Sequence, residues 1–181
     1  MRPRKWLFLV WVALSVIVID QLSKAIIVAS LEPYEEWMPI EAIRPFFSIT
    51  YVTNTGAAFG ILPQGGMLFT LIALIVVGVI IYFYRQLPER VWLVRVALGL
   101  QLGGALGNLI DRIRLGYVVD FLHVRFWPVF NIADSAIVIG VGLLMILMWR
   151  EDRRSAASKR EEAEAAKPLP PEDEPSSVTP R

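Results

Sequence analysis

Four long apolar stretches constrain this chain more than any other feature of its sequence. They cover residues 6–29, 67–84, 91–109 and 129–149. A helix needs about 20 predominantly apolar residues to cross the hydrocarbon layer of a membrane. Each stretch is near that length, and hydrophobic residues make up 55% of the chain while charged residues make up only 19%. The sequence therefore predicts a mainly α-helical membrane protein with four transmembrane helices.

Basic residues near the ends of these stretches predict the orientation. They precede the first stretch, lie within residues 85–90 and follow the last stretch. Because cytoplasmic loops carry an excess of Lys and Arg, we expect both termini in the cytoplasm and the loops at residues 31–66 and 112–128 on the outer side. Asp20 and Lys24 stand where a cleaved signal would need small residues, so the first helix is expected to be retained as an anchor.

The sequence also predicts how the chain is organised. Residues 1–150 are expected to form one four-helix transmembrane domain. Its outward loop at residues 31–66 contains aromatic and β-branched residues at 46–52, which favour a small β-sheet on the outer membrane surface. An interfacial aromatic belt is the alternative. Residues 151–181 are charged and then rich in proline, which predicts a short helical extension and a disordered cytoplasmic tail.

Several chemistries are excluded by composition. The chain has no cysteine and a single histidine, His123. Disulfides, a thiol nucleophile, a thiolate metal site and a multi-histidine metal site are therefore not available. A lone histidine near a membrane surface is more often a solvated side chain than a catalyst, and we assign no role to His123.

Charged residues within or beside the apolar stretches need a reason, because each costs roughly 2.5 to 3.5 kcal/mol at the centre of a membrane helix. Asp20 and Lys24 share a helix face, which predicts a structural ion pair in preference to a direct chemical role. Asp111 is expected at the outward end of the third helix, where it could fix Arg112 or Arg114. A solvated polar helix end is an equal alternative there.

Asp120 and Asp134 indicate a chemical role. Asn131 can cap the fourth helix and place Asp134 at the third helical position, where the helix dipole favours a carboxylate. Capping alone is the structural alternative for Asp134. Pro128 lies between the two aspartates, so the chain can turn back and bring their carboxylates together. Two carboxylates in one site share a proton, so one can act as acid while the other, as base, activates water. This pattern predicts aspartic-protease chemistry.

Five sequence blocks then match a known family in order. They are Asp20–Lys24, residues 54–60, residues 103–112, residues 118–121 and residues 130–135. Across residues 6–150 the chain resembles the lipoprotein signal peptidases (signal peptidase II), which are membrane aspartic proteases. The resemblance implies a four-helix enzyme of the bacterial inner membrane with a small extracytoplasmic sheet. It also implies the substrate, a prolipoprotein cut just before a cysteine that already carries diacylglycerol.

The resemblance further implies which residues form the site. Asp120 and Asp134 match the catalytic pair. The supporting or substrate-binding residues are Asp20, Lys24, Asn54, Gly56, Asn108, Asp111, Arg112 and Asn131. No metal or other cofactor is implied. The expected partners are lipidated prolipoproteins and membrane lipid but no nucleic acid, and the enzyme is expected to act as a monomer.

Two other functions explain part of the pattern. An ion-coupled transporter would also place carboxylates in a helical bundle, but in a chain through the membrane. Here the carboxylates map to the outward ends of the helices, and the chain lacks the internal repeat of many transporters. An assembly factor without chemistry would explain the small residues at 103–107 as helix packing. It gives no reason for four carboxylates at one depth.

Overall fold

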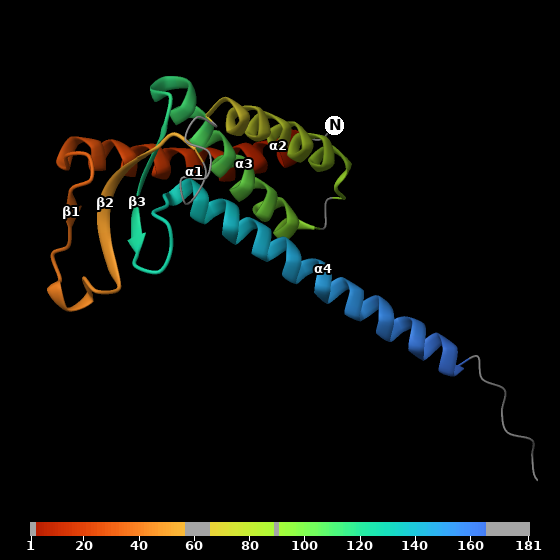
Figure 1. The fold of residues 1–181 in the computed structure, drawn as a ribbon. Helices are drawn as coiled ribbons and strands as arrows, with labels where there is room; N and C mark the ends of the chain where they lie inside the picture. The colour runs from red at the N-terminus through yellow and green to blue at the C-terminus, as the bar shows by residue number, and fades with distance from the viewer. Residues whose placement is uncertain (1–2, 57–65, 89–90, 166–181) are drawn as a thin grey trace, which may run out of the picture. The chain divides into compact units, whose positions relative to one another are not determined.

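Four long helices and a small sheet make up the part of the chain that the computed structural model describes, namely residues 3–56, 66–88 and 91–165 (Figure 1). The helices are α1 Pro3–Ser30, α2 Gly66–Gln86, α3 Trp92–Leu115 and α4 Ile132–Ala165. Each contains a segment long and apolar enough to cross a membrane. The predicted fold class, a mainly α-helical membrane protein with four spanning helices and a small sheet, is confirmed.

The sheet has three antiparallel strands in the order β1-β2-β3. They are β1 Glu36–Trp37, β2 Phe47–Asn54 and β3 Val118–Val124, and a short 3₁₀ helix, Glu41–Ile43, lies between the first two. The strand expected from residues 46–52 is confirmed as β2. β3 was not predicted, because its residues were expected to be part of a loop. The first four residues of β3 are all buried, so β3 lacks the polar–apolar alternation that marks a half-buried strand.

Both α3 and α4 differ from their predicted bounds. α3 was expected to end at residue 109 but continues to Leu115 and ends at Gly116, whose φ of 82° is left-handed. Its N–H donates to the carbonyl of Arg112 at 3.1 Å, a common way to close a helix. Asp111 therefore lies inside the helix and not at its end. α4 begins at Ile132 instead of residue 129, because Asn131 is its capping residue.

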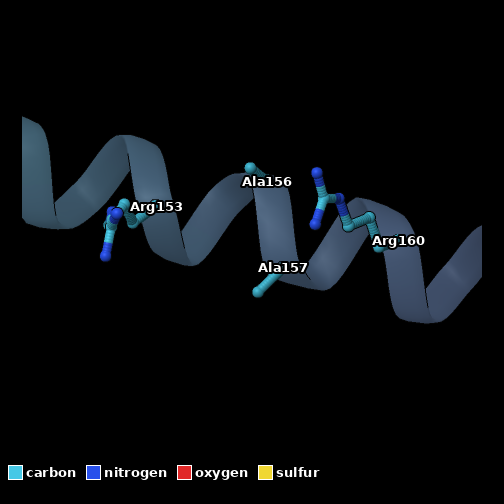
Figure 2. A pocket seen from close by; sticks show the side chains of 4 residues that line it. All are labelled: Arg153, Ala156, Ala157 and Arg160. Atoms are coloured by element: carbon cyan, nitrogen blue, oxygen red, sulfur yellow. The ribbon is translucent and has the colours of Figure 1, made fainter.

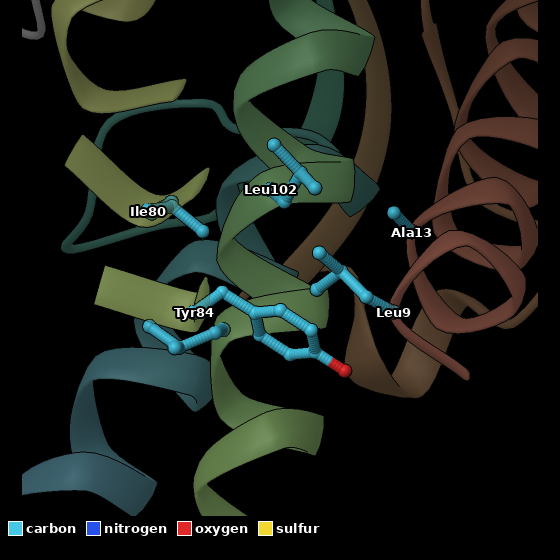
Figure 3. Close-up of a cluster of buried hydrophobic side chains, with 6 residues drawn as sticks. Leu9, Ala13, Ile80, Tyr84 and Leu102 are labelled. Carbon is cyan, nitrogen blue, oxygen red and sulfur yellow. The ribbon is translucent and has the colours of Figure 1, made fainter. Parts of the chain in front are cut away.

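The helices pack through small residues and one apolar cluster. A Cβ added to Gly103 would lie 2.7 Å from the carbonyl oxygen of Ala13, so α1 and α3 approach closely only because the side chain is absent. This contact confirms the packing role expected for the glycines. A cluster of buried side chains from α1, α2 and α3 fills the space beside it, as Figure 3 shows for Leu9, Ile80 and Tyr84. A second cluster, built around Tyr51, Val119, Phe121 and Ile27, packs the sheet against α1.

The chain divides into two compact units, with the boundary between Met145 and Ile146. In the second unit the described residues continue as helix to Ala165. The guanidinium of Arg153 lies 4.5 Å from the ring centroid of Trp149. Figure 2 shows Arg153 and Arg160, with two alanines, lining a surface pocket on this helix. These side chains include no nucleophile or general base, so we assign no catalysis to this pocket. The predicted disordered tail lies mostly in residues 166–181, outside the described residues.

Candidate active site

Two carboxylates occupy the place where β3 and the first turn of α4 meet the end of α3. Asp120 comes from β3 and is 2% exposed, and Asp134 lies in the first turn of α4. Asn131 donates from Nδ2 to Oδ1 of Asp120 at 2.7 Å, and Asn108 donates from Nδ2 to Oδ1 of Asp134 at 2.7 Å. The two amides are themselves joined, because Asn131 Nδ2 lies 3.0 Å from Asn108 Oδ1. A continuous chain of hydrogen bonds therefore links the two carboxylates.

Asn131 also begins α4. Its side-chain oxygen accepts a hydrogen bond from the N–H of Asp134 at 2.9 Å, and the Asn131 N–H lies 3.3 Å from Oδ2 of Asp134. This reciprocal arrangement satisfies two backbone donors that a helix start leaves free. The predicted capping role of Asn131 is confirmed. It fixes the side chain of Asp134 in its first helical turn.

Asn54 holds the second oxygen of Asp120. It lies at the end of β2 and donates from Nδ2 to Asp120 Oδ2 at 2.8 Å. Its own side-chain oxygen accepts from the N–H of Gly56 at 3.0 Å. The antiparallel register, in which Val52 faces Asp120, brings this turn to the carboxylate. Residues 57–60 of the same sequence block lie outside the described residues.

The surroundings of Asp120 shift its protonation. Burial raises the pKa of Asp120 to about 7, and the nearby negative charge of Asp134 acts in the same direction. Hydrogen bonds from Asn54 and Asn131 and the positive charge of Lys24 oppose this rise in pKa. A carboxyl group with such a pKa can hold or release a proton near neutral pH, as acid–base catalysis requires.

A buried ion cluster of Lys24, Asp20 and Asp111 lies next to the segments that carry Asp120 and Asp134. Lys24 Nζ lies 2.8 Å from Asp20 Oδ2, 2.8 Å from Asp111 Oδ2 and 3.1 Å from Asn108 Oδ1. The predicted pair of Asp20 and Lys24 is confirmed. Asp111 was expected either to fix Arg112 or Arg114 or to be a solvated helix end. It is buried, forms its ion pair with Lys24 and acts on Arg112 only as a nearby charge. The close approach of α1 and α3, with a Cβ added to Gly107 lying only 2.8 Å from Asp20 Oδ2, brings Lys24 to Asp111.

The same cluster holds the backbone immediately before each aspartate. Asp20 Oδ1 accepts a hydrogen bond from the N–H of Ala133 at 2.9 Å, and Asp111 Oδ2 accepts one from the N–H of Val119 at 3.1 Å. Ala133 and Val119 are the residues that precede Asp134 and Asp120 in the sequence. The ion cluster therefore fixes the backbone of the two segments that carry Asp120 and Asp134. Among the described contacts, Lys24, Asp20 and Asp111 form no hydrogen bond with the carboxylates of Asp120 and Asp134.

Two further side chains complete the surroundings. Gln21 was not assigned to the site, yet its Nε2 lies 2.8 Å from Asp111 Oδ1 and 3.2 Å from Asp20 Oδ2. Its place inside the Asp20–Lys24 block was the available signal. Arg112 lies with its guanidinium 5.7 Å from the ring centroid of Phe69. Within the described residues, no three His, Cys, Asp or Glu side chains gather where they could hold a metal ion.

The comparison with known proteins agrees with this geometry. A family model described as signal peptidase (SPase) II matches residues 12–150, which include every residue of the site. The chain belongs to the signal peptidase II family. The lipoprotein signal peptidase of Desulfitobacterium hafniense (strain DSM 10664 / DCB-2) is 49% identical over 148 residues, covering 81% of this chain and 96% of the relative. That of Moorella thermoacetica is 52% identical over 138 residues, covering 76% and 88%.

Solved structures show that the family resemblance extends to the fold. One bacterial membrane enzyme superposes with a TM-score of 0.73 at 34% identity, covering 80% of this chain and 88% of that one. A second superposes with a TM-score of 0.69 at 36% identity, covering 77% and 91%. The chain is thus a multi-pass membrane protein that shares the fold of these bacterial membrane enzymes.

Proposed function

We propose that Asp120 and Asp134 are the catalytic pair of this signal peptidase II, which makes it an aspartic endopeptidase. Membership of the family makes the chain a lipoprotein signal peptidase, an enzyme that removes signal peptides from prolipoproteins. The observation that carries the proposal is the hydrogen-bond chain through Asn108 and Asn131, which joins the buried carboxylate of Asp120 to the partly buried carboxylate of Asp134. Burial and the charge of Asp134 both favour a proton on Asp120, so the pair can hold one proton between them, as a general acid and a general base require.

In the proposed reaction one carboxyl of the pair is protonated and the other is ionised. The ionised carboxylate takes a proton from a water molecule as the water oxygen attacks the scissile carbonyl carbon. The protonated carboxyl gives its proton to the carbonyl oxygen, and a tetrahedral intermediate forms. Its collapse breaks the C–N bond: the leaving nitrogen takes the proton that the pair received from water, and one hydroxyl of the intermediate returns its proton to the other carboxylate as the new carbonyl forms. No covalent enzyme intermediate is formed, and the proton inventory of the pair is restored at the end.

The proposed substrate is a prolipoprotein whose cysteine carries diacylglycerol, cut just before that cysteine. Asp134 lies in the first turn of a membrane-spanning helix, and Asp120 lies in the strand that precedes it. A carboxylate pair at the end of a span is where a lipid-anchored peptide can reach it while its acyl chains remain in the bilayer. The same position removes the need for the acyl chains to enter water. We expect the monomer to suffice.

The proposed orientation follows from the basic residues. Arg85 lies in the last turn of α2, and Arg150, Arg153 and Arg154 lie beyond the apolar part of α4. The positive-inside rule places these ends in the cytoplasm. The carboxylate pair is at the opposite end of α4 and would then face outward. This is the side on which a translocated prolipoprotein presents its cleavage site.

The test is a cleavage assay with the purified full chain in lipid. A diacylglyceryl-modified prolipoprotein and its unmodified counterpart are incubated with the protein, and signal-peptide release is followed on a gel. We expect release from the lipidated substrate only. Equal cleavage of both substrates would contradict the lipid requirement, and no cleavage of either by folded protein would contradict the proposed function.

The pKa of Asp120 predicts a pH dependence. The pair must retain one proton to act, and the pKa of Asp120 is raised to about 7 by burial and by the charge of Asp134. We therefore expect kcat/KM to fall as the pH rises above about 7, with an apparent pKa that belongs to the pair. A raised carboxyl pKa also means that ionisation of Asp120 opposes folding, so stability should decrease from about pH 4 to about pH 7. A pH profile that stays flat up to pH 9 would contradict this assignment of the proton.

A further inference from the structure

A cavity of about 250 Å³ lies between α2, α3 and α4. α3 contributes Gln101, Ala105 and Asn108, which lie on one face of that helix at spacings of one turn. The rest of the lining is apolar, including Phe69 from α2 and Ile137 from α4, except for Arg112 of α3. Asn108, which lines the cavity, donates to Asp134 at 2.7 Å, so one end of the cavity lies next to the proposed catalytic pair. It is therefore a groove that leads from the carboxylates along α3.

Gln101 is the polar residue at the far end of this groove. Its Nε2 is buried and finds no hydrogen-bond partner in the described part of the chain. Gln101 lies near the middle of α3, a membrane-spanning helix, where no bulk water can satisfy a free donor. Buried donors in folded proteins are nearly always paired, so an unpaired one requires an explanation.

The neighbouring helix confines this side chain. A Cβ added to Gly140 of α4 would lie 2.8 Å from Cγ of Gln101 and 2.7 Å from the carbonyl oxygen of Ala97. α4 therefore packs directly on the stem of Gln101, and Gln101 is one of the residues that line the cavity. The packing of α4 therefore restricts where the Gln101 side chain can lie.

The spacing along α3 relates Gln101 to the site of cleavage. Gln101 precedes Asn108 by two helical turns, which places it about 10 Å further along the groove from the catalytic pair. An extended peptide covers that distance in about three residues, at about 3.3 Å per residue. The signal peptide is the part of the substrate that continues into the bilayer from the scissile bond. Its last residues before the cut are therefore the ones that would pass Gln101.

We propose that the side-chain amide of Gln101 donates a hydrogen bond to a backbone carbonyl of the signal peptide, about three residues before the scissile bond. This inference rests on the proposed function and extends it to the substrate's path. A peptide must leave its helical conformation near the bond that is cut, and its freed carbonyls then need donors because the membrane supplies none. The apolar walls of the groove accept the side chains, while Gln101 supplies one such donor.

The test combines an enzyme variant with modified substrates. Gln101→Met keeps the length of the side chain but removes the donor. We expect kcat/KM on a lipidated prolipopeptide to fall about 10-fold, carried mainly by KM. A series of substrates then carries a single amide-to-ester replacement at each of the five positions before the cut, which weakens one carbonyl acceptor at a time. One of these esters should reduce kcat/KM about 10-fold for the wild type and hardly at all for Gln101→Met.

Controls separate this inference from neighbouring explanations. Gln101→Asn keeps the amide on a shorter side chain, and its kcat/KM should lie between the values for the wild type and for Gln101→Met. Binding of the same peptides to Asp134→Asn, with and without Gln101→Met, measures the contact without cleavage and is independent of the catalytic assignment. Wild-type KM for Gln101→Met, or ester penalties that are equal in both enzymes, would overturn the inference. The inference would also be overturned if replacing the acyl esters of the substrate by ethers abolished the kcat/KM difference between the wild type and Gln101→Met. The acceptor would then be a lipid carbonyl.

Discussion

Asp120→Asn and Asp134→Asn are each expected to lower kcat by at least about 1,000-fold while leaving the protein inserted and folded. Either substitution removes the acid or the base from a pair that acts as a unit, and loss of a positioned proton-transfer group costs about 10²- to 10⁴-fold. Asparagine keeps the shape of the side chain, so the packing is kept. One oxygen that can accept a hydrogen bond from Asn131 or Asn108 is replaced by an NH2 group. The measurement is single-turnover cleavage of the lipidated substrate.

A matched control comes from the second unit. Asp152 is an exposed aspartate of the second compact unit, so Asp152→Asn makes the same chemical change outside the unit that holds the carboxylate pair. It should cleave at the wild-type rate. Thermal unfolding in detergent should be similar for all three variants and the wild type, since no buried charge is left without its partner. Turnover close to wild type by Asp120→Asn or Asp134→Asn would refute the catalytic pair.

The sequence was sufficient to predict the helices because their signal is local. A membrane span needs only length and apolar composition, and all four spans were identified before the structure was described. The capping of α4 by Asn131 was predictable for the same reason, since a cap depends on residues within one turn. The end of α3 was not predicted, because three charged residues before Gly116 resembled a loop although they continue the helix.

The parts of the site that the sequence did not predict are those that depend on contacts between distant segments. β3 is buried along its first residues and pairs with β2 from another loop, so neither its alternation nor its partner was visible in its own sequence. For Asp111 the sequence left open a neighbouring arginine or a solvated helix end, whereas the packing of α1 on α3 brings Lys24 to it. Gln21 and Gln101 were not predicted to have a role, because an uncharged side chain in an apolar stretch does not by itself indicate a function. Their importance depends on which atoms surround them, and sequence spacing does not contain that information.

Lys24→Met is expected to have the second largest effect, and on stability as well as on activity. Lys24 is the cation between Asp20 and Asp111, and its side chain is 4% exposed. Its removal leaves two buried carboxylates without a counter-charge, and breaking a buried ion pair in this way costs about 3 to 5 kcal/mol. The midpoint of thermal unfolding should fall clearly. Lys159→Met, a change at an exposed lysine, should leave it unchanged.

The ion cluster also predicts how the effect of Lys24→Met can be reduced. Because Asp20 and Asp111 accept the N–H groups of Ala133 and Val119, disturbing them should displace Asp120 and Asp134, the proposed catalytic pair. Adding Asp111→Asn to Lys24→Met removes one of the two uncompensated charges while keeping an oxygen for the Val119 N–H. The double variant should therefore unfold at a higher temperature than Lys24→Met alone, a non-additive result that indicates direct coupling. Strictly additive losses would mean that the lysine and the aspartate stabilise the fold independently, contrary to the geometry of the cluster.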